Sequence, residues 1–546
     1  MGALTSKNLP FELREWDIEY FESIDPTDSF GSNTRVYIKE NQVVQIEPDY
    51  NVYTHDLWIT DKGRQFFDSI FNTYKLKKKN LYATTWWPSI FDKIIYTLYF
   101  FDFFNVVQKS QKKFLIIFEN IGLETLSFIT ILQNNFSFLK LKKIEKHNLF
   151  NDFESNFQLN LSTNKIKLNL STFCLIVSNN PRYEGYYLNL YLKKRFSKGN
   201  FECCVLGSLT NLTFFTSFLG SSSITFVNII KGKHLICQKL KSKNKPFLIL
   251  NSDFFKRADR SVYLKALAVL QQSNLISTNW NGLNVLNYSL CENGIYASST
   301  FSTLKLKDLF TFSALYFLNI GANNSAVLKK LTESKLLNYF SFTKNKDFSR
   351  FLILDQSHLQ YNKSLFFSKN LNQTDYVLMP NNTFYENEET FINTKGSYCK
   401  TIKLITKEKN PWFFGGSDGE KTKSNWQILR RFVNNIREHI FFCSDIKDNI
   451  TLFPTFKTFN SFKNFINFNF FATIALTNLN FYLNKQTKPF VCLNYKFKQT
   501  TIKIYNTKLN YWLNDFFIGG KDEYSYNSKI LNSCSNIIKK ESTLFF

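Results

Sequence analysis

The sequence contains few metal-binding residues, and they follow no ligand-like spacing. Its 546 residues include nine cysteines and five histidines, without a single Cys-x2-Cys pair. The only adjacent cysteines, Cys203 and Cys204, fall on a strand-like run. Zinc and iron–sulfur sites use short, regular cysteine or histidine spacings, which are missing here. Dispersed thiols of this kind are typical of buried free cysteines in a reducing compartment.

Long hydrophobic runs are also missing. The richest, residues 94–107, contains Asp102 and is too short to span a bilayer, and residues 113–136 contain Glu119 and Glu124. The N-terminus has neither the apolar core of a signal peptide nor an arginine-rich presequence. We therefore expect no transmembrane helix. An organellar protein without a presequence would be most simply explained by synthesis inside the organelle.

Glycine and proline are scarce, with 18 and 10 residues, whereas phenylalanine (61) and tyrosine (27) are abundant. Phe, Ile, Asn, Lys and Tyr have AT-rich codons, so the composition points to an AT-rich organellar genome. The net charge of +25 leaves two alternatives, an anionic partner such as nucleic acid or lysines spread over solvated faces. Most basic residues are scattered and runs such as residues 77–79 are short, which favours the second.

The first part of the chain has the pattern of a β-hairpin followed by a helix. Asp61 and Lys62 precede the apolar run 66–71, which is typical of a helix start. Alternating apolar residues flank a turn at residues 40–42, and they are Val36, Ile38, Val43, Val44 and Ile46. We therefore predict a small β-rich module over residues 1–75.

Residues 76–440 alternate between short apolar runs and helix-like segments. Such alternation gives βαβ units and parallel sheets, so the predicted fold class is α/β. The strand-like runs are 114–118, 173–177, 202–207, 247–250, 314–321, 351–355 and 376–380. The predicted helices include 88–104, 123–133, 261–272, 281–290 and 326–331. Residues 138–167 read as variable surface or an insertion, and residues 441–546 as a divergent region rich in Phe, Asn and Lys.

Short motifs across the chain follow the order found in one protein family. They are GALTSK at 2–7, ESID at 22–25, GSN at 31–33, WITDK at 58–62, NNPRYE at 179–184, DYVLMP at 375–380 and NWQIL at 425–429. The sequence resembles the C-terminal half of the large iron–sulfur subunits of respiratory complex I. That half is similar to molybdopterin oxidoreductases such as formate dehydrogenase and DMSO reductase. The resemblance implies subdomains of that type behind a module that resembles a 4Fe-4S domain.

The resemblance also implies where a cluster would be held. It puts the four ligand positions of the module at Asp25, Asp28, Ser32 and Thr60, with the family's Cys-x2-Cys-x3-Cys-x27-Cys spacing preserved. None is a thiol, and iron–sulfur clusters are held essentially by cysteine thiolates. We therefore expect no cofactor and no metal in this chain. The 4Fe-4S and 2Fe-2S clusters are expected in a partner chain.

The start of the chain suggests what that partner is. In the family a Cys-Pro dipeptide comes directly before the GALTSK-like motif, and here Met1 stands in that place. We expect a separate ferredoxin-like fragment of the same subunit to supply the last cluster ligand. The chain would meet it, near the cluster, through a six-residue interface: Gly2, Ala3, Leu4, Thr5, Ser6 and Lys7.

The loops in which the family binds a pterin dinucleotide have few glycines here. The loop after residue 177 has none before Gly185, and the loop at 321–324 has only Gly321. A phosphate cradle needs several glycines and helix N-termini that offer backbone N–H groups. Binding of a large dinucleotide cofactor is therefore not predicted.

No residue pattern predicts catalysis. Arg182 and Glu184 have the chemistry of a catalytic pair, but residues in such a turn more often tie it to a neighbouring strand or subunit. His358 has no carboxylate or nucleophile motif near it, and Ser32 and Ser208 lack a G-x-S-x-G context. We predict no catalytic residue in this chain.

The interpretation favoured by the sequence is a structural subunit of the matrix-facing arm of mitochondrial complex I. The chain would scaffold and shield the iron–sulfur path of its ferredoxin-like partner, contact other peripheral-arm and accessory subunits, and bind no nucleic acid. NADH-to-ubiquinone electron transfer would belong to the assembly. A basic mitochondrial RNA-binding or ribosomal protein is the alternative, and an active molybdenum or tungsten oxidoreductase is a third.

Overall fold

The structure is a computed structural model, and it describes the chain in segments. The described residues are 14–40, 42–50, 57–72, 113–135, 139–143, 169–252, 276–277, 280–298, 302–304, 312–319, 351–356, 374–378, 382–405, 424–431, 508–509, 515–519, 522 and 524–544. The predicted helices 88–104, 261–272 and 326–331 lie outside these segments.

Three antiparallel strands form the N-terminal module in the order β1–β2–β3, which confirms the predicted hairpin. They are β1 (Glu19–Ile24), β2 (Asn33–Lys39) and β3 (Gln42–Pro48). Val36 and Ile38 lie on one face of β2 because side chains alternate, and a register shift in the β2–β3 pairing brings Val43 and Ile46 to the same buried face. Two short helices, α2 (Asp61–Gln65) and α3 (Asp68–Asn72), bring Phe66 and Ile70 into the same apolar cluster.

Two parallel sheets follow, as the alternation of apolar runs predicts. The five-stranded sheet has the order β12 (Leu283–Leu286), β9 (Phe247–Asn251), β6 (Phe173–Val177), β7 (Glu202–Leu206), β8 (Ser217–Gly220). The six-stranded sheet has the order β13 (Ser302–Thr303), β5 (Leu139–Lys143), β4 (Lys113–Phe118), β14 (Phe312–Leu318), β15 (Phe351–Gln356), β16 (Thr374–Leu378). The α/β fold class is confirmed.

Both faces of the five-stranded sheet are covered, and its central strand shows how. Phe173, Leu175 and Val177 of β6 pack in one cluster with residues of α10 (Ser223–Ile230) and α11 (Ile236–Ser242). Cys174 and Ile176 point to the opposite face, toward α9 (Tyr186–Ser197). Burial on both faces explains why the strand is an unbroken apolar run rather than an alternating one.

One predicted helix was wrong. Residues 281–290 do not form a helix, because Leu283–Leu286 is the edge strand β12, paired in parallel with β9. All four of its residues are buried. A short apolar run cannot be assigned to strand or helix from its pattern alone, and here pairing with β9 decides. The helix follows instead as α13 (Glu292–Ser298).

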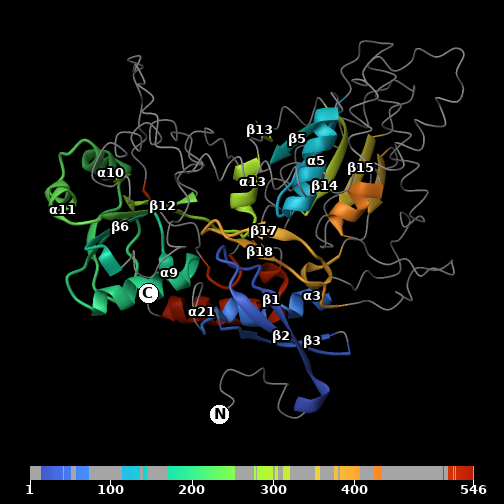
Figure 1. The fold of residues 1–546 in the computed structure, drawn as a ribbon, viewed down its shortest axis with the longest axis horizontal. Coiled ribbons are helices and arrows are strands. Elements are labelled where there is room, and N and C mark those ends of the chain that lie inside the picture. Colours follow the sequence, from blue (N-terminus) through green and yellow to red (C-terminus); the bar gives the residue numbers. More distant parts are fainter. Residues whose placement is uncertain are drawn as a thin grey trace, which may run out of the picture.

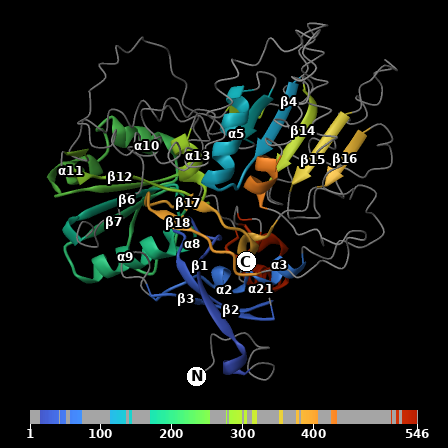
Figure 2. The ribbon, with the colours of Figure 1, turned by 45° about the vertical axis from the view of Figure 1, so that its right-hand side comes forward.

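Segments from both ends of the chain and from its middle meet around the module. The hairpin of β17 (Thr390–Ile392) and β18 (Tyr398–Lys400) lies between the module and the parallel sheets in both ribbon views (Figures 1 and 2). The C-terminal helix α21 (Lys529–Leu544) packs beside α2 and α3. The module core therefore includes Tyr385, Tyr524 and Leu531 from distant parts of the sequence.

The part of the sequence predicted to be variable also contributes to the core. Residues 138–167 include β5, which pairs in parallel with β4. Leu139 and Leu141 of this strand are buried. The rest of that segment, and residues 441–507, lie outside the described residues.

Candidate functional site

The structure brings together the four positions aligned with cluster ligands. The Asp28 carboxylate accepts hydrogen bonds from Ser32 Oγ at 2.8 Å and from the Gly31 N–H at 2.7 Å. The Asp25 N–H donates to the Ser32 carbonyl at 2.8 Å. Thr60 begins helix α2 and its Oγ1 accepts from the Gly63 N–H at 2.9 Å. The loop between β1 and β2, which carries Asp25, Asp28 and Ser32, thus lies against the start of α2, where Thr60 stands.

The Asp25 side chain fills the space between that loop and α2. Its Oδ1 accepts from Thr27 N–H at 2.8 Å and Thr27 Oγ1 at 2.7 Å. Its Oδ2 lies 2.0 Å from where a Cβ on Gly63 would stand. A residue larger than glycine at position 63 would therefore collide with this carboxyl group.

Burial dominates the electrostatics of this group. Asp25 is fully buried, and desolvation, followed by the neighbouring Asp28, raises its pKa to about 8. Desolvation likewise raises the pKa of Asp28 and of Tyr186, whose hydroxyl lies 2.8 Å from Ser32 Oγ. A carboxyl group with a pKa near 8 is mostly protonated at neutral pH. Asp25 is therefore a neutral hydrogen-bonding group rather than a charged ligand.

The donor set at the four positions does not fit a 4Fe-4S cluster. Asp25, Asp28, Ser32 and Thr60 offer oxygen atoms, whereas clusters are held by thiolates. One thiol lies nearby: Cys399 Sγ is 3.3 Å from where a Cβ on Gly31 would stand. Among the residues that the structure describes, no group of three or more His, Cys, Asp or Glu side chains could hold a metal ion.

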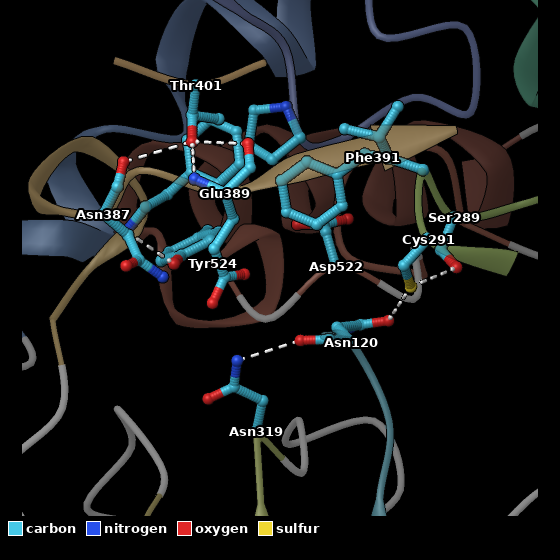
Figure 3. A pocket seen from close by; sticks show the side chains of 13 residues that line it. Asn120, Ser289, Cys291, Asn319, Asn387, Glu389, Phe391, Thr401, Asp522 and Tyr524 are labelled. Carbon is cyan, nitrogen blue, oxygen red and sulfur yellow. Dashed lines mark hydrogen bonds between the residues drawn. The ribbon is translucent and has the colours of Figure 1, made fainter. Parts of the chain in front are cut away.

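A second polar region lies at the carboxyl ends of the parallel strands. A small cavity of about 60 Å³ is lined by Asn120 after β4, Asn319 after β14, Cys291 after β12 and Glu389 before β17 (Figure 3). The same edge of a parallel sheet binds ligands in α/β proteins generally. In this chain, residues that line the cavity form hydrogen bonds with one another. Asn319 Nδ2 donates to the Asn120 carbonyl at 2.9 Å, and Cys291 Sγ donates to Asn120 Oδ1 at 3.2 Å.

Glu389 is a buried acid of this region. It accepts hydrogen bonds from the Gly122 N–H and from Thr125 Oγ1, both at 3.0 Å. Desolvation, followed by Glu124, raises its pKa to about 7. Burial also raises the pKa of the Cys291 thiol to about 11, so it is not a reactive thiolate. Glu389 therefore fastens the β17 hairpin to the start of α5 (Leu123–Asn135).

Arg182 and Glu184 do not act on each other. The Arg182 Nη1 group donates to the Asn211 carbonyl at 3.3 Å. Glu184 accepts from the Asn180 N–H at 3.0 Å and from the Tyr288 hydroxyl at 3.2 Å. Glu184 thus ties the turn after β6 to the loop after β12.

Several residues singled out from the sequence lie outside the described residues. They are the loop at 321–324, His358 and the six-residue N-terminal interface of Gly2, Ala3, Leu4, Thr5, Ser6 and Lys7. Ser208 follows β7 and has no hydrolase motif around it.

Sequence reasoning missed the residues that hold the module against the parallel sheets. Asn393 Nδ2 donates to the Phe30 carbonyl at 3.0 Å, and the Thr394 N–H donates to the Ser29 carbonyl at 2.8 Å. Lys62 and Asp522 form a buried ion pair at 2.7 Å. Lys62 is the last residue of the WITDK motif, so a signal was present for it, whereas none of the motifs quoted above contains Asn393 or Asp522.

Two family models match the chain. The model described as molybdopterin oxidoreductase matches residues 106–435. The model described as NADH-ubiquinone oxidoreductase NDSU1/NuoG-like, 4Fe-4S domain matches residues 18–68. These matches confirm the resemblance to complex I subunits and to molybdopterin oxidoreductases.

Curated relatives are also named as subunits of NADH-ubiquinone oxidoreductase or NADH dehydrogenase. The chain is 26% identical over 455 residues to the NADH-ubiquinone oxidoreductase 75 kDa subunit of Reclinomonas americana, covering 79% of this chain and 59% of that protein. It is 25% identical over 575 residues to the subunit of the same name from Acanthamoeba castellanii, covering 100% and 70%. A mitochondrial iron–sulfur protein 1 of NADH dehydrogenase from Solanum tuberosum is 27% identical over 300 residues, covering 52% and 38%. The chain thus spans between 38% and 70% of the length of these relatives.

A solved structure has a weaker likeness. The formyltransferase/hydrolase complex FhcABCD from Methylorubrum extorquens aligns with a TM-score of 0.39 and 8% identity, covering 64% of this chain and 97% of that chain. That likeness is too low to carry an argument. Within the described segments, no helix has the length and apolar character needed to cross a bilayer.

The matches correct the prediction about cofactors. We expected iron–sulfur clusters in a partner chain and none in this one, and that prediction was wrong, because residues 18–68 themselves match a 4Fe-4S domain. The iron–sulfur domain belongs to this chain. The oxygen side chains at the four aligned positions still do not fit a cluster, so we derive no electron-transfer step through them. With a family model that matches residues 106–435, the chain belongs to the molybdopterin oxidoreductase family.

Proposed function

We propose that this chain is a peripheral, matrix-side subunit of mitochondrial complex I that works as a scaffold for the iron–sulfur electron path. In this role its 4Fe-4S-type module and the domains behind it scaffold and shield an iron–sulfur path that continues into a ferredoxin-like partner during NADH-to-ubiquinone electron transfer. The observation that carries the proposal is the pair of family matches in one chain, a complex I 4Fe-4S domain followed by a molybdopterin oxidoreductase domain. Relatives along the chain are named complex I subunits.

The contacts around the module support a rigid scaffold. Its ligand-like loop is bonded to the β17–β18 hairpin by Asn393 and Thr394, and its helix α2 to the C-terminal segment through Lys62. The Asp68 carboxylate also accepts from the Ile530 N–H at 3.1 Å, at the start of α21. Buried polar contacts of this kind fix one arrangement, because each broken contact leaves an unsatisfied group.

The loop after β6 argues against an active molybdopterin site. An incoming phosphate would bind the free N–H groups at the start of the next helix. Here the Asn180 N–H donates to the Glu184 carboxylate, and Asn180 Oδ1 accepts from the Arg182 N–H at 3.2 Å. A carboxylate from the chain itself thus stands where an anionic ligand would bind.

Comigration with enzyme activity tests the proposal. Native mitochondrial membrane complexes are fractionated by size, assayed for NADH oxidation and analysed by mass spectrometry. We expect this chain in the NADH-oxidising fraction, together with a separate cysteine-rich ferredoxin-like polypeptide. Comigration with ribosomal RNA, reversed by high salt, would instead support the RNA-binding alternative.

A further inference from the structure

The first strand of the module is an exposed edge. Strand β1 pairs with β2 on one side, and the sheet order β1–β2–β3 leaves its other side without a described strand. Its first four residues, Glu19 to Glu22, are exposed on both faces of the sheet. In both ribbon views the start of β1 and the short helix η1 (Glu15–Asp17) project away from the two parallel sheets (Figures 1 and 2).

Large aromatic side chains gather on this projection. Trp16 is 79% exposed, Tyr20 61% and Phe21 38%. Tyr20 packs across the pair against Tyr37 of β2, with ring centroids 6.2 Å apart. Edge strands of soluble proteins are usually blunted by charged residues, proline or a bulge; the exposed half of β1 has neither proline nor a bulge, and its charges, Glu19 and Glu22, are both acidic. Exposed aromatic clusters with adjoining polar residues are typical of protein interfaces.

The charge of this projection is opposite to that of the whole chain. Residues 15–22, EWDIEYFE, contain four acids and no base, whereas the chain carries a net charge of +25. Glu19 and Glu22 are both exposed. Asp17 lies 3.4 Å from Lys39 Nζ, so one acid is already paired within the module. The acidic character repels nucleic acid and anionic membrane surfaces and attracts a basic protein surface.

We propose that β1 is a docking edge that receives an extended, basic and partly apolar segment of another subunit. The segment adds as a strand beside β1, its backbone pairs with the free edge, and its apolar residues cover Tyr20 and Phe21. Its lysines or arginines meet Glu19 and Glu22. This mode of recognition takes affinity from main-chain hydrogen bonds and specificity from side-chain contacts. The setting, a multisubunit assembly, rests on the proposed function.

Carbodiimide coupling tests this on the native complex, because it joins a carboxylate directly to a lysine in contact with it. We expect Glu19 or Glu22 to be recovered coupled to a lysine of another polypeptide, within a peptide that also carries apolar residues. Glu202 is the internal control, since it lies 3.1 Å from Lys239 and 3.2 Å from Lys243 and should couple within this chain. Binding of the identified peptide, made synthetically, should weaken at least about tenfold in the E19K/E22K variant. It should be unchanged in E388K, at an exposed acid elsewhere on the surface.

Three outcomes overturn the inference. Coupling of Glu19 and Glu22 only to lysines of this chain would mean that the chain covers its own edge. Coupling to a second copy would make the face a homodimer contact, and free carboxylates in the native complex would mean that nothing docks there. The proposed function fails separately, if the chain is absent from the NADH-oxidising fraction. Coupling of Glu19 or Glu22 to a basic partner in a different assembly would keep the docking edge while rejecting complex I.

Discussion

Lys62 Nζ and Asp522 Oδ1 lie 2.7 Å apart, and both side chains are buried. Lys62 belongs to α2 of the N-terminal module, and Asp522 precedes the C-terminal helix. The pair therefore joins the N-terminal module to the segment before the C-terminal helix, two parts of the chain that also share the apolar cluster of Phe66 and Tyr524. Because each charge is desolvated, its partner is what makes its burial tolerable.

Removing one partner of this pair should be costly. We expect Lys62→Met to lower the free energy of unfolding by about 3–5 kcal/mol, since it leaves Asp522 buried without its counter-charge. Urea denaturation of the purified chain measures the loss. The double variant K62M/D522N removes the unpaired charge while the amide oxygen can still accept from the Ser525 N–H, so it should recover most of the loss. A single variant as stable as the wild type would contradict the buried pair.

Gly63 should not tolerate even the smallest side chain. An added Cβ would lie 2.0 Å from Asp25 Oδ2. Alanine within a helix normally stabilises by about 1 kcal/mol relative to glycine. Here we expect Gly63→Ala to destabilise by about 1–3 kcal/mol, because the site is already filled. The measurement is thermal unfolding of G63A against the wild type and of G63A/D25A against D25A. Alanine at position 63 should destabilise less when the Asp25 carboxyl is absent. A stabilised G63A would mean that Asp25 lies elsewhere.

Asp25 should make stability fall as the pH rises. Its pKa is raised from 3.8 to about 8 in the folded chain. Between those values the unfolded carboxyl has lost its proton while the folded one keeps it, so the folded state binds more protons. The unfolding free energy should then decrease by up to about 1.4 kcal/mol per pH unit from pH 4 to pH 8.

The matched variants for this pH dependence are Asp25→Asn and Glu389→Gln. D25N should flatten the slope of stability against pH up to about pH 8. E389Q should remove only the contribution between the ordinary glutamate value of 4.5 and about 7. Urea midpoints at pH 5, 6, 7 and 8 check both. A slope that D25N leaves unchanged would show that Asp25 is ionised in the folded chain.

Asn393 should be important for holding the module to the rest of the chain. Its Nδ2 donates to the Phe30 carbonyl, and its Oδ1 accepts from the Lys395 and Ser397 N–H groups at 3.0 and 2.9 Å. We expect Asn393→Ala to cost about 2–4 kcal/mol, since it leaves buried partners unsatisfied. Limited proteolysis of N393A should also be faster than that of the wild type, because the β17–β18 hairpin is held less tightly to the module. Asn244→Ala, at an exposed position, serves as the control and should change stability by less than about 0.5 kcal/mol.

Local pattern predicted much of the fold because the relevant physics is local. The alternation around residues 40–42 indicated the hairpin, whereas the register shift at Tyr37 and Ile38 in the β2–β3 pairing came from the structure alone. The unbroken apolar run Phe173–Val177 indicated a strand covered on both faces. Local pattern failed for Leu283–Leu286, because so short a run, with three apolar residues, fits a helix or a strand equally well. Pairing with β9 makes it a strand.

The sequence by itself determined the fold class and the hairpin module, and it has oxygen side chains at Asp25, Asp28, Ser32 and Thr60, the positions that the resemblance aligns with cluster ligands. Only the tertiary structure decided that these four lie together, that Gly63 makes room for Asp25, and that Lys62 meets Asp522. Those pairings join residues up to hundreds of positions apart. No local periodicity specifies them, because they follow from how whole elements pack. The same packing leaves β1 at the edge of its sheet, with its acids and aromatic rings exposed.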